Sequence, residues 1–360
     1  MITVQTASRL HFGLLSFPSG PNWPNHLGEM TVPARRFGGV GLMVQAPGIV
    51  LRFWSPENRS ENPPIADGPD CPSTLELTHD WIACGPLAER AWGFALRFTD
   101  SLRHERNKFS NTGSELIPHA LEIVIERSAP EHVGLGTGTQ LALAVARGLS
   151  EVLRLPRKPA DLCLRVGRGA RSALGVHGFF QGGFLVEGGQ TGDSKVAPLV
   201  TRLPFPEAWR IVLVVPPWGT GVHGQHEADA FQQLHGLPLS QTERLCRLAL
   251  LGLVPALIEK DLAAFGEALF DFNGSAGQIF AGIQNGMYAS PRITELIQFI
   301  RRQGITGVGQ SSWGPTVFAV VEDESRGKEL ARQIRDSFGL QGHEVIVTAA
   351  CNHGATVTQC

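Results

Sequence analysis

The chain has 360 residues, of which 42% are hydrophobic and 18% charged, a balance typical of a globular protein with one large or two ordinary domains. Its formal net charge of -2 excludes the broad positive surface with which proteins bind nucleic acids or anionic membranes, so any anion must be met by a local site. No segment has the roughly 18 uncharged apolar residues that a membrane span needs, and the first residues lack the basic and apolar regions of a signal peptide. We therefore expect a cytoplasmic protein with neither nucleic acid nor membrane as a partner.

The six cysteines are far apart in the sequence, and no two of them form a Cys-x-x-Cys pair. They are Cys71, Cys84, Cys163, Cys246, Cys351 and Cys360. Because no histidine stands beside them at ligand spacing, we expect free thiols rather than a zinc site or a disulfide framework.

Local patterns predict the elements of the first half in chain order. Prolines among polar residues predict a surface excursion over residues 55–74. Apolar residues at helical spacing predict a helix over 86–102, and a polar stretch predicts a loop over 104–114. Alternating apolar residues then predict a strand over 121–127 with one solvated face. The next helix, over 139–153, is apolar nearly all round in its first two turns, so we expect it to be buried.

The remaining elements are predicted from short apolar runs and amphipathic stretches. Strands are expected over 183–187, 196–200, 210–215, 304–310, 315–321 and 343–349, and helices over 240–253, 260–272, 291–303 and 324–337. The strand–strand–helix–strand order at the end is typical of an α+β half with its own sheet. We predict two domains, 1–206 and 207–360, with the active site at their interface.

A glycine-rich turn, Gly134-Leu-Gly-Thr-Gly-Thr-Gln140, leads directly into the predicted buried helix. Converging backbone N–H groups at a helix N-terminus bind phosphate well, and glycines let the backbone approach the anion. The hydroxyls of Thr137 and Thr139 add hydrogen-bond donors or metal ligands. The turn lacks the Gly-Lys-Ser/Thr of a Walker loop and is a poor match to the dinucleotide-binding fingerprint. On spacing alone, a phosphate site and a tight turn that lets the helix pack closely are equally good interpretations.

Three segments, in this order, resemble the motifs of the GHMP kinase superfamily. They are Ala7-Ser-Arg-Leu-His-Phe-Gly13, Pro130-Glu-His-Val-Gly-Leu-Gly-Thr-Gly-Thr-Gln140 and Gly307-Val-Gly-Gln-Ser-Ser-Trp-Gly-Pro315. The resemblance spans almost the whole chain. It implies the two-domain α+β fold of that superfamily, in which the N-terminal half is like domain 2 of ribosomal protein S5 and the C-terminal half is a ferredoxin-like α+β unit.

More specific variants of these segments resemble the beta-ribofuranosylaminobenzene 5'-phosphate synthase family. They cover residues 9–13, 36–42, 134–142, 168–172 and 309–315. The resemblance implies that phosphoribosyl pyrophosphate condenses with 4-aminobenzoate or 4-hydroxybenzoate, with release of CO2 and pyrophosphate. A C-glycosidic bond forms at the ring carbon that loses its carboxylate, which makes the first committed intermediate of methanopterin. The family also implies a requirement for Mg2+ and suggests a homodimer.

Two departures from the kinases of the superfamily concern the chemistry. Those kinases carry a catalytic Asp before a Gly-Gly pair, and counting back from Gly182 and Gly183 places Gly175 at that position. A kinase needs the carboxylate to deprotonate its acceptor hydroxyl, whereas a decarboxylative C-glycosylation has no such hydroxyl to deprotonate. The second Ser of the kinase motif is Gly138 here, which leaves open which threonine hydroxyl meets Mg2+.

Basic residues of the matching segments are the candidate catalytic groups. Arg168 and Arg171 stand three apart at the end of a predicted helix, where both can face an anion, with surface salt bridges as the alternative. Arg36 is a further candidate for binding the carboxylate or a phosphate. Arg9 and His11 share a face of the first predicted strand. His11 then either polarises or protonates the substrate or is a core histidine with satisfied hydrogen bonds.

Phosphate and substrate contacts are expected from the glycine turn, which offers backbone N–H groups, and from the third motif, which offers side-chain donors. Trp313 either stacks on the aromatic acid or packs in the core. The expected contact residues are Gly134, Leu135, Gly136, Thr137, Gly138, Thr139, Gln140, Ser172, Gln310, Ser311, Ser312 and Trp313.

The candidate ligands for Mg2+ are Thr137, Thr139 and Glu187, the last chosen by its place after the glycine pair. His223, His226 and Glu227 also have metal-like spacing, but a loop that leads into a helix explains most of that pattern. Residues 352–355 are interpreted as a structural turn.

Two alternatives to the synthase stay open at this point. One is a small-molecule kinase that moves the γ-phosphoryl group of ATP to an alcohol, which Gly175 disfavours. The other is a non-catalytic ligand-binding protein on the same fold, which the glycine turn and the arginine pair disfavour.

Overall fold

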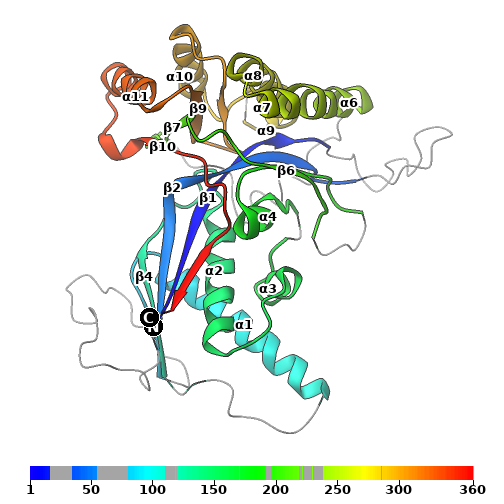
Figure 1. The fold of residues 1–360 in the computed structure, drawn as a ribbon, viewed down its shortest axis with the longest axis vertical. Coiled ribbons are helices and arrows are strands. Elements are labelled where there is room, and N and C mark those ends of the chain that lie inside the picture. Colours follow the sequence, from blue (N-terminus) through cyan, green and yellow to red (C-terminus); the bar gives the residue numbers. More distant parts are fainter. Residues whose placement is uncertain are drawn as a thin grey trace, which may run out of the picture.

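The computed structural model describes residues 1–16, 35–54, 80–109, 118, 120–169, 171–191, 196–218, 221, 229, 238–284 and 286–359. The excursion predicted over 55–74 lies outside these residues. Figure 1 shows two sheets, each accompanied by its own group of helices.

The first sheet is built around two long antiparallel strands. β1 (Ile2–Leu14) pairs with β2 (Gly39–Trp54) along nearly its whole length, with irregularities between Thr6 and Ser8 and between His11 and Gly13. The strand order is β11-β1-β2-β4-β3, and β5 pairs with the opposite end of β2 and with β6. The other strands are β3 (Asp80–Cys84), β4 (Ala120–Arg127), β5 (Phe184–Glu187), β6 (Leu199–Leu203) and β11 (Thr356–Gln359).

Four helices pack against this sheet and bury an apolar core with it (Figure 1). The second of them is buried, as its apolar first turns predict, and contacts both long strands. These helices are α1 (Ala88–Phe109), α2 (Thr137–Val152), α3 (Pro159–Arg165) and α4 (Leu174–Gln181).

The loop predicted over 104–114 is wrong in its first part, because α1 continues to Phe109. Glu105 lies on this last stretch of the helix and pairs with Arg165 of α3 at 2.7 Å. A solvated helix end carries no apolar periodicity, so the polar composition resembled that of a loop.

The second half forms an antiparallel sheet in the order β10-β7-β9-β8. With β7 first in the sequence, this is the order of a ferredoxin-like α+β unit, as the resemblance implies. Its strands are β7 (Arg210–Val214), β8 (Val308–Gln310), β9 (Val317–Val321) and β10 (Val345–Thr348). Its helices are α6 (Leu239–Leu248), α7 (Val254–Glu259), α8 (Leu262–Gly277), α9 (Ala281–Gln284), α10 (Pro291–Arg302) and α11 (Glu324–Phe338).

The two faces of this second sheet pack against different partners. Side chains alternate along β7, so Val212 and Val214 join the core with α10 and α11. Ile211 and Leu213 join the core that β1, β2 and α8 form. In the core that β7 shares with β1, β2 and α8, the rings of Phe12 and Phe318 have centroids 4.9 Å apart. The two halves therefore share an apolar core where they meet.

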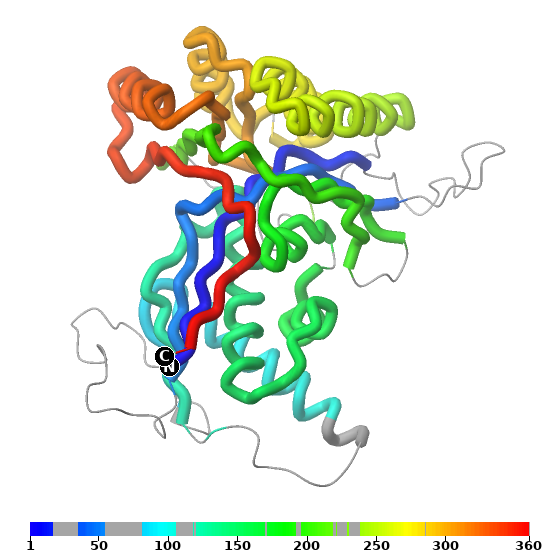
Figure 2. Tube along the Cα trace, viewed as in Figure 1, coloured from blue at the N-terminus to red at the C-terminus, as the bar shows by residue number. Residues whose placement is uncertain are grey.

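The chain returns to the first sheet at its end. β11 pairs antiparallel with the start of β1, with Gln359 opposite Ile2, so both ends lie side by side (Figure 2). The predicted boundary at 206/207 falls between β6 and β7.

Among the described helices, none combines the length and the apolar composition that crossing a bilayer requires. Cys84, Cys163, Cys246 and Cys351 are free thiols.

Candidate active site

The glycine turn ends at the N-terminus of α2, as its sequence predicts. Gly136 is the N-cap residue with a φ of 72°, a left-handed conformation that glycine adopts without strain. A Cβ added at Gly134, whose φ is 92°, would collide with the carbonyl oxygen of Ser311. The hydroxyl of Thr137 donates to the carbonyl oxygen of Pro130 at 2.6 Å, which anchors the start of the helix. The N–H groups of Thr139 and Gln140 donate to the carbonyl oxygen of Gly136 at 3.0 and 3.2 Å. An anion at the turn would therefore meet the earlier N–H groups of the helix and gain from its dipole.

Hydrogen bonds join β1 to the two other motifs. The backbone N–H of Arg9 donates to the carbonyl oxygen of Leu135 at 2.9 Å, and that of Ser312 donates to the carbonyl oxygen of His11 at 3.0 Å. From α8, the amide of Asn273 donates to the carbonyl oxygens of Phe12 and Gln310 at 2.7 and 2.8 Å. Three segments that are far apart in the sequence therefore form one rigid site.

A polar cavity lies over the glycine turn. Its walls carry guanidinium groups, backbone N–H groups and hydroxyls. The lining residues are Arg9, Arg90, His132, Gly134, Leu135, Gly136, Thr137, Gly138, Thr139, Arg168, Gly221, Ser312, Trp313 and Gly314.

Arg90 is a member of this cavity that the sequence did not point to. It comes from the first turn of α1 and forms an ion pair with Glu131, just before the glycine turn. Burial lowers the pKa of the Arg90 guanidinium, which nevertheless stays charged. Nothing in local spacing distinguishes Arg90 from a surface arginine, because only the packing of α1 against α2 brings it to the turn.

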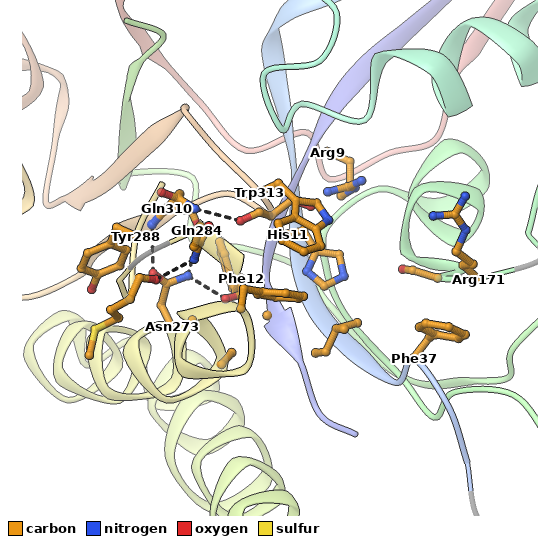
Figure 3. A pocket seen from close by; sticks show the side chains of 18 residues that line it. Arg9, His11, Phe12, Phe37, Arg171, Asn273, Gln284, Tyr288, Gln310 and Trp313 are labelled. Carbon is orange, nitrogen blue, oxygen red and sulfur yellow. Dashed lines mark hydrogen bonds between the residues drawn. The ribbon is translucent and has the colours of Figure 1, made fainter. Parts of the chain in front are cut away.

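An apolar cavity, whose lining Figure 3 shows, shares three lining residues with the polar one. Its residues come from β1, α8, the segment after α9 and the third motif. Trp313 packs against Phe280 with ring centroids 4.2 Å apart. The lining residues are Arg9, His11, Phe12, Gly13, Leu14, Phe37, Arg171, Ser172, Asn273, Ala276, Gly277, Phe280, Gln284, Met287, Tyr288, Gln310, Ser312 and Trp313. Arg9, Ser312 and Trp313 line both cavities and mark their junction.

His11 contributes a neutral imidazole to the apolar cavity. Its side chain is buried, and burial together with the charge of Arg9 holds its pKa well below 6.5. Its backbone N–H donates to the hydroxyl of Ser311 at 3.0 Å. His11 is therefore uncharged near neutral pH, and the cations of this cavity are Arg9 and Arg171.

The predicted pair Arg168 and Arg171 is not on a helix end, because α3 already ends at Arg165. Arg168 lines the polar cavity and lies over the ring of Phe94, 4.9 Å from its centroid. Arg171 lines the apolar cavity. The loop between α3 and α4 thus sends one arginine to each cavity.

Neither cavity is lined by the predicted catalytic residue Arg36 or by two predicted contact residues, Gln140 and Ser311. Arg36 is exposed and exchanges backbone hydrogen bonds with Gln190 at 2.8 and 2.7 Å. Gln140 is fully buried: its side chain accepts from the hydroxyl of Thr6 at 2.5 Å and donates to the carbonyl oxygen of Gly175 at 2.8 Å. Ser311 is also fully buried. Gln140 and Ser311 therefore form hydrogen bonds inside the protein and do not line a cavity.

Glu187 is fully buried as well and lines neither cavity. Its carboxylate accepts from the hydroxyl of Ser172 and from the backbone N–H of Ala173, both at 2.5 Å. Burial raises the pKa of Glu187 to about 7, against the opposing effect of these hydrogen bonds and of Arg9. The carboxylate thereby holds the turn that carries Arg171 and Ser172.

No group of three His, Cys, Asp or Glu side chains gathers among the described residues. Mg2+ needs no such cluster, because it is usually bound through one or two carboxylates plus substrate phosphates. Of the predicted ligands, Thr137 and Thr139 both line the polar cavity and Glu187 does not. The Thr137 hydroxyl donates to the carbonyl oxygen of Pro130, which fixes its direction. His223, His226 and Glu227 lie outside the described residues.

The turn over 352–355 is held by Asn352, whose side chain exchanges hydrogen bonds with the backbone of Phe205, both at 2.8 Å. It lines neither cavity.

Comparison with known proteins shows to which family the chain belongs. Residues 95–183 match the GHMP kinases N terminal domain, and residues 253–340 match the GHMP kinases C terminal. The chain is 33% identical to beta-ribofuranosylphenol 5'-phosphate synthase of Methanothermobacter thermautotrophicus over 98% of both chains. The chain belongs to this family. It is also 29% identical, over 99% of both chains, to the family member of Archaeoglobus fulgidus.

Solved structures with the same fold confirm the two-domain GHMP kinase architecture. Homoserine kinase from Cytophaga hutchinsonii matches with a TM-score of 0.59 at 16% identity, over 99% of this chain and 97% of its own. Mevalonate diphosphate decarboxylase from Staphylococcus aureus matches with a TM-score of 0.58 at 14% identity, over 100% and 99%. At such identities the likeness concerns the fold alone.

Gly175, at the position that resembles the kinase Asp, is buried against α2. A Cβ added there would lie 3.1 Å from Cγ2 and 3.5 Å from Cβ of Thr139. Its carbonyl oxygen accepts from Gln140, and it lines neither cavity. A larger side chain at this position would therefore press on Thr139.

Proposed function

We propose that this chain is a beta-ribofuranosylphenol 5'-phosphate synthase, which condenses phosphoribosyl pyrophosphate with 4-hydroxybenzoate in methanopterin biosynthesis. The observation that carries the proposal is the junction of an arginine-lined polar cavity with an aromatic-lined apolar cavity at Arg9, Ser312 and Trp313. One cavity suits a pyrophosphate and the other suits a benzoate. The phenol in the name of the relatives favours 4-hydroxybenzoate over 4-aminobenzoate as the acceptor.

The reaction balances without a net proton transfer from the protein. The bond between the anomeric carbon and pyrophosphate breaks, and its electron pair leaves with pyrophosphate. The ring carbon that bears the carboxylate forms a bond to the anomeric carbon. The bond to the carboxylate then breaks, its electron pair restores the aromatic ring, and CO2 leaves.

The polar cavity stabilises the leaving pyrophosphate. Arg9, Arg90 and Arg168 line it together with the glycine turn, so charge-assisted hydrogen bonds and first-turn N–H groups meet the negative charge as it develops. These donors are held by packing before the substrate arrives, so little reorganisation accompanies the reaction. Holding both substrates at the junction adds the advantage of proximity.

The apolar cavity orients the benzoate ring. Arg171 lies on the same side of it as Arg9 and His11, opposite Gln284 and Tyr288 (Figure 3). The carboxylate therefore points toward the arginines and the hydroxyl toward the far side. The neutral ring of His11 gives a hydrogen-bonding group beside the acid without a third charge.

We propose that Mg2+ enters with the substrate phosphates, because Mg2+ is usually bound through one or two carboxylates plus substrate phosphates. The homodimer suggested by the resemblance stays a prediction, which light scattering of the purified protein would test.

The kinase alternative is disfavoured because the catalytic acid is absent at Gly175, where a side chain would also press on Thr139. A kinase of this type deprotonates its acceptor with that carboxylate. A non-catalytic binding protein would retain the anion site but has no need of an adjoining aromatic cavity.

The decisive experiment incubates the purified protein with phosphoribosyl pyrophosphate, Mg2+ and carboxyl-labelled 4-hydroxybenzoate or 4-aminobenzoate, in parallel with ATP and candidate alcohols. We expect labelled CO2, with faster release from the hydroxy acid. Formation of ADP without CO2 would instead establish the kinase. If no reaction mixture gave CO2 or ADP, the result would favour the binding protein.

A further inference from the structure

The space above Gly138 is occupied by guanidinium groups. A Cβ built on Gly138 would lie 2.5 Å from Nη2 of Arg90 and 3.5 Å from Nη2 of Arg168. Gly138 has an ordinary helical place in the first turn of α2, and its φ is not positive, so backbone strain does not require a glycine. The glycine instead leaves room for the close approach of the arginines, and a Cβ here would displace the end of the flexible Arg90 side chain.

Arg90 is held in this place by an ion pair. Glu131, seven residues before Gly138, pairs with its guanidinium. The side chain of Arg90 is 33% exposed, and burial lowers the pKa of its guanidinium. The guanidinium has five N–H donors, so it can bind an anion in the cavity while it keeps its contact with Glu131.

Three guanidinium groups converge on the same cavity, since Arg9 also lies against the turn: a Cβ on Gly136 would be 3.1 Å from Nε of Arg9. A polyanion among these guanidinium groups and the helix N-terminus would be attracted by all of them at once. Guanidinium groups bind phosphoryl oxygens in a fork, with two parallel hydrogen bonds. The cluster fits a diphosphate better than it fits a single phosphate.

We infer that Arg90 is a pyrophosphate-binding residue, and that Gly138 is required because it leaves room for the Arg90 guanidinium beside that of Arg168. At this corner of the cavity, arginine supplies the positive charge that a protein-held metal ion would otherwise supply. The inference rests on the proposed function in so far as pyrophosphate is the group bound here.

Calorimetric titration of the protein with inorganic pyrophosphate, in EDTA and then in Mg2+, tests this. We expect wild type to bind pyrophosphate in EDTA and Arg90→Gln to bind at least tenfold more weakly. Arg103→Gln, an exposed arginine on the same helix, is the matched control and should bind like wild type. If Arg90→Gln fails to fold, Arg90→Lys replaces it, since it keeps the charge but loses the fork. Binding by the Arg90 variant equal to that of Arg103→Gln, or wild-type binding that disappears in EDTA, overturns the inference.

Gly138→Ala makes the test specific. Alanine is the better helix former, so local structure alone predicts no loss. We expect weaker pyrophosphate binding because Arg90 is displaced, and no further loss when Gly138→Ala is added to Arg90→Gln. Additive losses in the double variant, or full affinity in Gly138→Ala, would show that Gly138 does not act through Arg90.

The labelled-CO2 assay separates this inference from the proposed function. Arg90-dependent pyrophosphate binding without CO2 release would leave the anion site standing and remove the synthase. CO2 release together with unchanged pyrophosphate binding in the Arg90 variant would support the synthase and overturn the role inferred for Arg90.

Discussion

The hydroxyl of Ser311 donates a hydrogen bond to the carbonyl oxygen of Gly134 at 2.7 Å, which ties the third motif to the glycine turn. The same hydroxyl accepts from the backbone N–H of His11 at 3.0 Å. One buried side chain therefore joins all three motifs, and the relative position of the two cavities depends on it.

Ser311→Ala should loosen this junction. Removal of the hydroxyl leaves the carbonyl of Gly134 and the N–H of His11 without their buried partner, which costs about 1–3 kcal/mol. We expect a lower free energy of unfolding in urea together with a higher KM for phosphoribosyl pyrophosphate. Ser325→Ala, on the exposed face of α11, is the control. Equal stability of the two variants would contradict the role of this hydrogen bond.

Gly136→Ala should reduce activity beyond its effect on stability. An alanine at a φ of 72° costs about 1–2 kcal/mol, and its Cβ would also press on Nε and Cβ of Arg9 at 3.1 and 3.2 Å. Gly339→Ala pays a similar conformational cost, because Gly339 has a φ of 66° but no neighbour within 4 Å. We expect both variants to melt at lower temperature and only Gly136→Ala to lose more than tenfold in kcat/KM. A turn that serves packing alone would give equal activities.

Glu187→Gln should remove a pH dependence of stability. The pKa of the carboxyl rises from its ordinary 4.5 to about 7 on folding, so the folded protein binds this proton more tightly than the unfolded chain. The resulting stabilisation is fully present below about pH 4.5 and is lost as the pH rises through about 7, a change on the order of 3 kcal/mol.

Urea unfolding of wild type from pH 4 to 8 should show this slope, and Glu187→Gln should flatten it. Glu329→Gln, an exposed acid on α11, should keep the wild-type slope. Identical slopes in all three proteins would mean that Glu187 does not titrate in this range.

Phe280→Ala and Arg168→Gln should separate the two substrates. Phe280 lines only the apolar cavity and Arg168 only the polar one. Loss of the Phe280 ring removes about 1–3 kcal/mol of apolar contact, so the KM for 4-hydroxybenzoate should rise tenfold or more. Arg168→Gln should raise the KM for phosphoribosyl pyrophosphate instead. Each variant controls for the other, and parallel changes in both KM values would argue against two separate subsites.

Gly175→Asp should destabilise the protein and should not create a kinase. The new side chain would meet Thr139 at 3.1 Å in a buried place, where overpacking and an unpaired acid together cost about 2 kcal/mol or more. Gly342→Asp, at a glycine with no neighbour within 4 Å, is the control. ADP formation from ATP and an alcohol by Gly175→Asp would show that the position still faces the reacting groups.

Much of the architecture was predictable from local pattern. The apolar first turns of α2 and the alternation in β4 mark elements whose period is visible in a short window. The end of α1 was missed because a solvated helix end has no apolar period. Arg168 and Arg171 were predicted at a helix end, whereas α3 already ends at Arg165.

The sequence by itself predicted a glycine turn at 134–140 that leads into a buried helix, and it left a phosphate site and a tight packing turn as equal interpretations, because glycines before a helix serve both. Only the tertiary structure decided which side chains surround that turn. Arg90 lies at the turn because α1 packs on α2. Gln140 and Ser311 are instead buried and form hydrogen bonds inside the protein. A short stretch of sequence is enough to predict a turn before a helix. Which distant segments come together depends on how the cores pack, and a short stretch of sequence does not contain that information.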